Sequence, residues 1–225
     1  MTISKKLVIF SDFDGTITER DVIVMIMEKF AVPEWVDIKD KILYERTITL
    51  KDGVEKLFGL IDSKKKDEIV KFAVKEAKLR NGFKDFLDFC KSEKIEFNVV
   101  SGGLDFFIEA VLESFKNKLK IYCNGTKLNS NKIKIHYKYL PKNCTLCGDC
   151  GCCKIEIIEQ YPRDRYVRVL IGDSLTDLAP SKVVDIVFAR SDLIKYLEQE
   201  KISYVAFKDF NEVKQKLQEK YLQKI

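Results

Sequence analysis

Two aspartates separated by one residue are the first side chains in this sequence whose spacing could support chemistry. Asp12 and Asp14 follow the apolar run at residues 7–10 and Ser11. Residues i and i+2 of an extended segment point to the same side, so both carboxylates can converge on one point. Two like charges held that close are unfavourable unless a cation lies between them or one carboxylate is protonated. A polar turn, with aspartate capping a helix, is the simpler alternative.

A hydroxyl and two glycines follow the second apolar run, at residues 97–100. Ser101, Gly102 and Gly103 would expose backbone N–H groups where a strand gives way to a helix, which suits the binding of an anion. A tight strand-to-helix turn requires the same residue types, so the pattern alone leaves both interpretations open.

Two more aspartates follow the third apolar run, at residues 166–171. Asp173 falls at the predicted strand end, and Asp177 falls in the first turn of the next helix. The helix dipole favours an acidic residue there, which explains Asp177 structurally but leaves Asp173 unexplained. Ligands bind at the carboxyl ends of the strands in open α/β sheets, so we expect the three polar groups at one edge.

The elements that would position these groups are short runs of β-branched and aromatic residues with helical stretches between them. Five such runs occur, at residues 7–10, 97–100, 166–171, 185–189 and 204–207. Strands that alternate with helices predict an α/β fold with a Rossmann-like, mostly parallel sheet.

Two insertions interrupt the predicted core of residues 1–17 and 81–225. Residues 18–80 carry a mainly helical pattern and predict a helical cap inserted after the first strand. Residues 122–153 contain the alternating run 133–137, preceded by turn-forming residues, which predicts a β-hairpin before a cysteine-rich segment.

Composition excludes several classes of protein. Hydrophobic residues form 46% of the 225 residues and charged residues 33%, which favours a folded core over extended disorder. The net charge of +5 is spread along the chain and falls short of the basic stripe typical of nucleic-acid binding. No apolar stretch near the start is long enough for a signal or a membrane span. We therefore expect a soluble cytoplasmic protein, monomeric or homodimeric, with neither a membrane nor a nucleic-acid partner.

Five of the seven cysteines fall within ten residues. Cys144, Cys147, Cys150 and Cys153 are spaced C-x₂-C-x₂-C-x₂-C, with Cys152 in addition. This spacing suits a structural Zn²⁺ or an iron–sulfur cluster, and reduced, metal-free thiols are the third interpretation. An odd count without an export signal argues against a disulfide framework.

Taken in order along the chain, these groups resemble the signature of one enzyme superfamily. The Asp-x-Asp pair, Ser-Gly-Gly, Lys154 and Gly-Asp-x-x-x-Asp are similar in type and order to the motifs of the haloacid dehalogenase superfamily. The helical insertion resembles the cap of phosphoserine phosphatases. Further segments along nearly the whole chain resemble more closely the methionine-salvage phosphatases that act on 2-hydroxy-3-keto-5-methylthiopentenyl-1-phosphate. These segments are Pro33-Glu34-Trp35, Phe58-Gly59-Leu60, Asp105-Phe106-Phe107, Ile121-Tyr122-Cys123-Asn124, Gly151-Cys152-Cys153-Lys154 and Phe188-Ala189-Arg190.

The resemblance implies a phosphatase that works through a covalent intermediate. Asp12 would attack phosphorus and form an aspartyl-phosphate, and Asp14 would act as general acid and then as general base. Ser101 and the N–H of Gly102 would bind phosphate oxygens. Lys154 would offset charge on the phosphoryl group and on the nucleophile, with an ordinary solvated lysine as the alternative.

The resemblance also implies a magnesium site. The carboxylates of Asp12 and Asp173 and the backbone carbonyl of Asp14 would bind Mg²⁺. Thr16 would brace Asp14 by hydrogen bonding, and Asp177 would orient the lysine or a metal-bound water.

The expected substrate is a small phosphorylated metabolite, with phosphoserine as the main alternative. Phosphoserine phosphatases use a cap Glu and a cap Arg to bind both ends of the amino acid, and the matching positions fall near Asp21 and Glu55. An acidic residue there would repel the substrate carboxylate, although Arg20 could compensate. A zinc-binding module on an inactive scaffold is a different class, and it predicts loss of the catalytic residues that this chain retains. The sequence therefore predicts an Mg²⁺-dependent phosphomonoester hydrolase.

Overall fold

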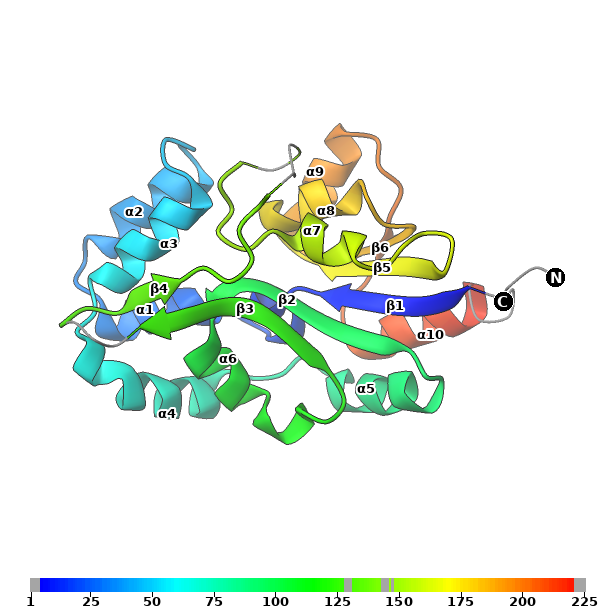
Figure 1. The fold of residues 1–225 in the computed structure, drawn as a ribbon, viewed down its shortest axis with the longest axis horizontal. Coiled ribbons are helices and arrows are strands. Elements are labelled where there is room, and N and C mark those ends of the chain that lie inside the picture. Colours follow the sequence, from blue (N-terminus) through cyan, green and yellow to red (C-terminus); the bar gives the residue numbers. More distant parts are fainter. Residues whose placement is uncertain (1–4, 128–130, 143–145, 147, 221–225) are drawn as a thin grey trace.

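The computed structural model describes residues 5–127, 131–142, 146 and 148–220, and its centre is a seven-stranded sheet. The strands lie in the order β4-β3-β2-β1-β5-β6-β7, and every neighbouring pair is parallel except β3 and β4 (Figure 1). Their bounds are β1 Lys6–Ser11, β2 Glu96–Leu104, β3 Lys120–Lys127, β4 Lys134–His136, β5 Tyr166–Gly172, β6 Ile186–Ala189 and β7 Val205–Ala206. The predicted α/β fold with a mostly parallel sheet is confirmed.

The central strand β1 is apolar on both faces. Val8, Ile9 and Phe10 are fully buried, and β1 pairs with β2 on one side and β5 on the other. Alternate side chains of a strand point to opposite faces, so a strand covered on both faces needs a continuous apolar run. The polar residues that follow β1, β2 and β5 consequently lie side by side at the carboxyl edge of the sheet.

Helices cover both faces of the sheet (Figure 1). On one face lie α5 Phe83–Ser92, α6 Asp105–Val111 and α10 Phe210–Lys220; on the other lie α7 Lys154–Glu159, α8 Leu178–Ser181 and α9 Ser191–Gln199. Short helical turns, η1 Phe13–Ile17, η3 Glu113–Phe115 and η4 Leu175–Asp177, lie between these elements. Within the described ranges, no helix has the length and apolar character needed to cross a membrane.

Four helices between β1 and α5 lie beyond the carboxyl edge of the sheet (Figure 1, left). They are α1 Val22–Phe30, α2 Trp35–Leu43, α3 Leu50–Gly59 and α4 Lys66–Glu76, with the turn η2 Ser63–Lys65 before α4. Asp21 and Thr49 cap α1 and α3, because each side chain accepts a hydrogen bond from a backbone N–H of the first turn. Phe58 of α3 stacks on Phe107 of α6, so these helices share one hydrophobic core with the sheet.

The chain leaves the sheet for these four helices after β1 and returns before α5, and Arg80 links these two connections. This residue is buried, with 8% of its surface exposed. Its guanidinium donates hydrogen bonds to the backbone carbonyls of Gly15 (2.7 Å), Thr16 (2.8 Å) and Thr18 (2.9 Å). Its backbone N–H donates to the carbonyl of Ile17 at 2.8 Å. The junction is thus fixed largely through main-chain acceptors.

The chain between β3 and α7 extends the sheet and contacts α3. β4 pairs with the end of β3 as an antiparallel hairpin, at the place where the alternating sequence predicts one. Lys51, in the first turn of α3, forms an ion pair with Asp149 at 3.0 Å. Tyr137 donates a hydrogen bond to the carbonyl of Lys51 at 3.2 Å. The segment that leads into α7 is therefore held against α3.

β3 is a strand of the main sheet that the sequence pattern does not predict. Its sequence contains Asn124, Gly125 and a lysine at each end, so neither strand propensity nor alternation marks it. Parallel pairing with β2 and antiparallel pairing with β4 stabilise it instead. β7 is also shorter than the predicted run 204–207, and the turn residues between β3 and β4 fall partly outside the described residues.

Candidate active site

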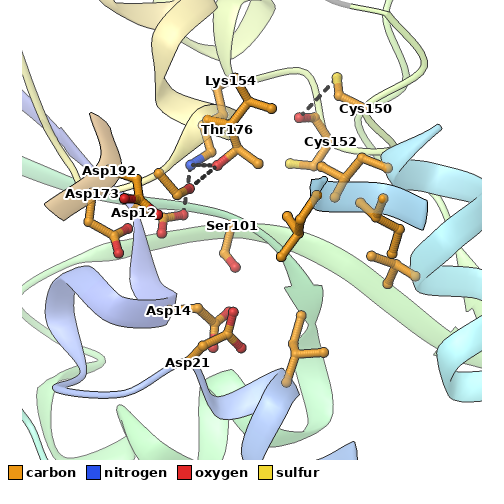
Figure 2. A pocket seen from close by; sticks show the side chains of 18 of the residues that line it. Asp12, Asp14, Asp21, Ser101, Cys150, Cys152, Lys154, Asp173, Thr176 and Asp192 are labelled. Carbon is orange, nitrogen blue, oxygen red and sulfur yellow. Dashed lines mark hydrogen bonds and ion pairs between the residues drawn. The ribbon is translucent and has the colours of Figure 1, made fainter. Parts of the chain in front are cut away.

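Asp12 and Lys154 form the centre of the site. Asp12 follows β1 and Lys154 begins α7, and each residue has 6% of its surface exposed. The lysine Nζ lies 2.6 Å from Asp12 Oδ1 and 2.7 Å from Asp177 Oδ1 (Figure 2). Because Lys154 is buried between two carboxylates, the alternative of an ordinary solvated lysine is wrong.

Asp173 follows β5 and lies close to Asp12. Oxygens of Asp12, Asp173 and Asp177 lie within 4.8 Å of one another, and they form the metal-compatible group of acidic, histidine or cysteine side chains found among the described residues. Thr16 donates a hydrogen bond to Asp173 Oδ1 at 3.0 Å. The predicted bond from Thr16 to Asp14 is therefore wrong, because the turn η1 directs this hydroxyl toward the end of β5.

Gly15 allows η1 to approach Asp173 closely. Its φ is +74°, in the left-handed region, and a Cβ at this position would lie 2.4 Å from Asp173 Oδ2. Its carbonyl accepts hydrogen bonds from both Arg80 (2.7 Å) and Arg190 (2.6 Å). Two guanidinium groups thus fix the turn that follows β1. The sequence analysis gave neither arginine a role, because a main-chain acceptor leaves no pattern in the sequence.

Asp177 positions both the lysine and the loop after β5. Its Oδ1 accepts from Lys154, and its Oδ2 accepts from the backbone N–H groups of Asp173 (3.1 Å) and Ser174 (3.3 Å). These contacts match the expectation that Asp177 orients Lys154. Because both of its oxygens already accept hydrogen bonds, Asp12 and Asp173 are the better candidates for metal ligands.

Asp14 lies at the start of α1, below Ser101 in Figure 2. Its Oδ1 accepts a hydrogen bond from the backbone N–H of Val22, the first residue of α1, at 2.8 Å. Asp21, which caps α1, lies beside it in the cavity lining. The partial positive charge of the helix N-terminus stabilises the charged forms of both carboxylates.

Ser101 and Gly102 form the β2 side of the site, and both line the cavity. Ser101 is buried, and its Oγ accepts a hydrogen bond from the N–H of Gly103 at 3.0 Å. The side-chain amide of Asn124 in β3 donates to the carbonyl of Gly102 at 2.9 Å, which fixes the orientation of that peptide. The sequence analysis did not give Asn124 this supporting role, because β3 was not expected beside β2.

Burial dominates the electrostatics of the site. It raises the pKa of Asp12 to about 7 and the pKa of Asp173 to about 8, and it raises the pKa of Asp14 well above 3.8. Burial opposes the charge of Lys154, but the neighbouring charges of Asp12 and Asp177 outweigh this effect and raise the pKa of the lysine. Burial therefore makes it costly to ionise these carboxyl groups together, and a divalent cation would offset their charge.

These groups occupy one end of a cavity of about 410 Å³. The lining also includes aliphatic side chains of the four-helix segment, namely Ile23, Ile42, Leu43, Leu50 and Val54. Figure 2 shows most of the carboxylates gathered on one side of the cavity and side chains of carbon alone on the other. The cavity thus separates a charged end from an apolar end, which is typical of a site for a small amphipathic ligand.

The cysteine-rich segment contributes two side chains to this cavity. Cys150 and Cys152 line it (Figure 2). Burial raises the pKa of Cys152, so this thiol stays protonated and uncharged. Cys144 and Cys147 lie outside the described residues. The zinc or iron–sulfur site that needs them stays a prediction.

The model of the haloacid dehalogenase-like hydrolase family matches residues 9–180. The chain belongs to this family. The 2-hydroxy-3-keto-5-methylthiopentenyl-1-phosphate phosphatase of Brevibacillus brevis is 43% identical over 218 residues, which cover 96% of this chain and 97% of that protein. The phosphatase of the same name from Geobacillus thermodenitrificans is 43% identical over 214 residues, which cover 95% and 96%.

Solved structures of phosphoserine phosphatases share the fold of this haloacid dehalogenase-like hydrolase. A substrate-bound phosphoserine phosphatase superposes with a TM-score of 0.72 at 20% identity, covering 94% of this chain and 98% of that chain. A phospho-aspartyl intermediate analogue of phosphoserine phosphatase gives a TM-score of 0.68 at 18% identity, covering 94% and 99%. The predicted superfamily, fold and enzyme class, a phosphatase, are confirmed.

Proposed function

We propose that this haloacid dehalogenase-like phosphatase is an Mg²⁺-dependent phosphomonoester hydrolase whose substrate is 2-hydroxy-3-keto-5-methylthiopentenyl-1-phosphate of methionine salvage. The observation that carries the proposal is the buried Asp12, held by Lys154 at the charged end of a cavity whose far end is apolar. Relatives 43% identical over almost the whole chain carry the name of this activity.

Asp12 is the nucleophile in this proposal. One of its oxygens forms a bond to phosphorus as the bond from phosphorus to the ester oxygen breaks, which gives an aspartyl-phosphate and an alkoxide. Burial raises the pKa of Asp14 and so favours its protonated form, which gives its proton to that alkoxide. Water then attacks phosphorus and gives a proton to Asp14, and inorganic phosphate leaves as Asp12 is restored. Lys154, 2.6 Å from the nucleophile, offsets negative charge throughout.

Mg²⁺ fits the acidic end of the cavity. The carboxylates of Asp12 and Asp173 and the backbone carbonyl of Asp14 would hold it. When bound, the ion supplies positive charge that neutralises these carboxylates and the phosphoryl group. The hydroxyl of Ser101 and the N–H of Gly102 bind phosphoryl oxygens in this arrangement.

The charges that line the cavity favour a substrate without a carboxylate. Among the described lining residues, five are aspartates and Lys154 is the single base. Arg20, which could have bound a substrate carboxylate, pairs with Glu28 at 3.0 Å on the exposed surface. Glu55 accepts a hydrogen bond from Tyr137 at 3.3 Å and is not among the described lining residues. A second anionic group on the substrate would meet mainly like charge, so phosphoserine is disfavoured.

We also propose that residues 18–80 act as a cap over a core of residues 1–17 and 81–225, with residues 122–153 as a further wall. Helices α1, α2 and α3 supply the apolar side of the cavity, and the strand ends supply the phosphate side. A cap is needed because bulk water must stay away from the phosphoryl group until the leaving group has departed. Zn²⁺ at the Cys144 to Cys153 cluster would make the wall next to Lys154 more rigid. A small metabolite as substrate fits a cytoplasmic location.

A comparison of two substrates with and without Mg²⁺ tests the proposal. We expect kcat/KM for the methylthiopentenyl phosphate to exceed that for phosphoserine at least tenfold, a gap of about 1.4 kcal/mol. Excess EDTA should stop the hydrolysis of both, and of p-nitrophenyl phosphate. Equal or reversed kcat/KM values would favour phosphoserine phosphatase, and turnover that survives EDTA would count against the metal-dependent mechanism.

A further inference from the structure

The apolar end of the cavity is built by the corner between α2 and α3. Ile42 and Leu43 end α2, and Leu50 and Val54 lie on the first two turns of α3. Ile42 and Val54 are buried, with 9% and 7% of their surface exposed, although both line the cavity. This wall is therefore packed from behind and presents a fixed apolar surface to whatever occupies the cavity.

Gly53 determines how closely the Ile42 side chain of this wall packs against α3. A Cβ at Gly53 would lie 2.3 Å from both Cδ1 and Cγ1 of Ile42. Glycine in the interior of a helix lowers its stability by roughly 0.5–1 kcal/mol relative to alanine, so the helix gains nothing from it locally. What it provides is space: Ile42 packs directly against the α3 backbone. Any side chain at position 53 would displace Ile42, which itself lines the cavity.

Charge is absent from this wall in the part of the chain that the structure describes. The lining aspartates lie at the strand ends, the start of α1 and the start of α9, and Lys154 begins α7. Helices α2 and α3 contribute Ile42, Leu43, Leu50 and Val54. A ligand that fills the cavity must place its phosphate among the polar groups. The group at its other end then meets aliphatic carbon, which favours an uncharged apolar chain.

We infer that Ile42, Leu50 and Val54 form a specificity-determining subsite for an apolar tail on the leaving group, and that Gly53 sets the length of tail it accepts. The inference rests on the proposed phosphatase function and deepens it. The ligand class is a phosphate monoester with an uncharged alkyl or thioether chain several atoms long. Each methylene of the tail that enters the subsite adds about 0.8 kcal/mol of favourable transfer.

Straight-chain alkyl phosphates, from ethyl to pentyl phosphate, test the subsite in the full-length protein with Mg²⁺. For the wild type, kcat/KM should rise about fourfold per methylene, so that pentyl phosphate exceeds ethyl phosphate by about sixtyfold. Gly53→Ala should lower this pentyl-to-ethyl ratio at least about fivefold, because the displaced Ile42 shortens the subsite. Gly59→Ala is the matched control in the same helix, since a Cβ at Gly59 meets nothing within 4 Å. Its ratio should equal that of the wild type.

Leu50→Asn provides a second variant in case Gly53→Ala disturbs folding. It places an amide in the subsite at similar volume, and it should lower the same ratio by a similar factor. A wild-type ratio near one with intact turnover, or an unchanged ratio in both folded variants, would overturn the subsite but leave the phosphatase intact. Absence of Mg²⁺-dependent turnover with every phosphate monoester would instead overturn the proposed function, and the subsite with it.

Discussion

Replacement of Asp173 by asparagine should stabilise the metal-free protein at alkaline pH and remove its stabilisation by Mg²⁺. Burial, and next the charge of Asp12, raises the pKa of Asp173 to about 8 from its ordinary value of 3.8. Between these two values the folded protein keeps a proton that the unfolded chain has released. The free energy of unfolding of the wild type therefore falls as pH rises through this window. Asparagine keeps the shape and an oxygen that can accept from Thr16, but it carries no charge.

The size of the effect follows from the same pKa values. Ionising Asp173 lowers the folding stability by at most about 6 kcal/mol, at about 1.36 kcal/mol per pH unit across the window from 3.8 to about 8. Asp173 is partly exposed to the cavity, and water there screens its charge, so we expect a gain of about 1–3 kcal/mol in the variant. Mg²⁺ at about a hundred times its dissociation constant should stabilise the wild type by about 2.7 kcal/mol, but the variant far less.

Urea unfolding at about pH 5 and about pH 8, each with EDTA or with Mg²⁺, measures both effects. The gain from Asp173→Asn should be largest at the higher pH with EDTA. Asp192→Asn is the control, because Asp192 lines the same cavity but is exposed and pairs with Lys195 at 2.8 Å. The reasoning is refuted if Asp173→Asn is less stable than the wild type at the higher pH in EDTA, or if Mg²⁺ stabilises both proteins equally.

Three further substitutions probe other parts of the molecule. Asp12→Asn should lower turnover of p-nitrophenyl phosphate more than a hundredfold, which is a loss above ~2.7 kcal/mol in transition-state stabilisation. Its circular dichroism spectrum should be unchanged. A smaller loss of turnover would mean that Asp12 is not the nucleophile. Gly15→Ala should lower kcat at least about tenfold and weaken Mg²⁺ binding measured by calorimetry, because its Cβ would lie 2.4 Å from Asp173 Oδ2. A variant that binds Mg²⁺ with wild-type affinity would contradict this prediction. Lys51→Ala should speed amide hydrogen exchange in the first turn of α3, because the 3.0 Å ion pair with Asp149 is lost. Exchange as slow as in the wild type would show that this ion pair does not stabilise the helix.

The residues expected to do the chemistry could be located from sequence because their position depends on strands that local pattern reveals. Asp12 and Asp173 directly follow β1 and β5, and the largely apolar sequence of each of these strands marks a strand that is buried on both faces. Parallel neighbours then bring the two carboxylates together at one edge. To place the two carboxylates at one edge, only the types of the elements and their order along the chain must be known. Local sequence patterns indicate both.

Other features could not be predicted because they depend on tertiary contacts. β3 is held by pairing on both sides and not by its own composition, so Asn124 and its hydrogen bond to Gly102 were not expected. The direction of the Thr16 hydroxyl depends on the conformation of η1, where a positive φ at Gly15 turns the chain. The burial of Arg80 against backbone carbonyls has no sequence pattern, because any residue can supply the acceptor.

The way Arg80 is held has a consequence for how new specificities could arise in this protein. Its guanidinium contacts the junction at carbonyls of the main chain, and Arg190, which follows β6, donates to the same Gly15 carbonyl. Side chains between α1 and α4 can then change without removing an acceptor of either arginine. Helices with a different inner surface could be grafted between residues 22 and 78, by recombination or by design, while the turn that follows the proposed nucleophile keeps its shape. If residues 18–80 act as the proposed cap, this junction would let the cap be exchanged without altering the proposed catalytic core.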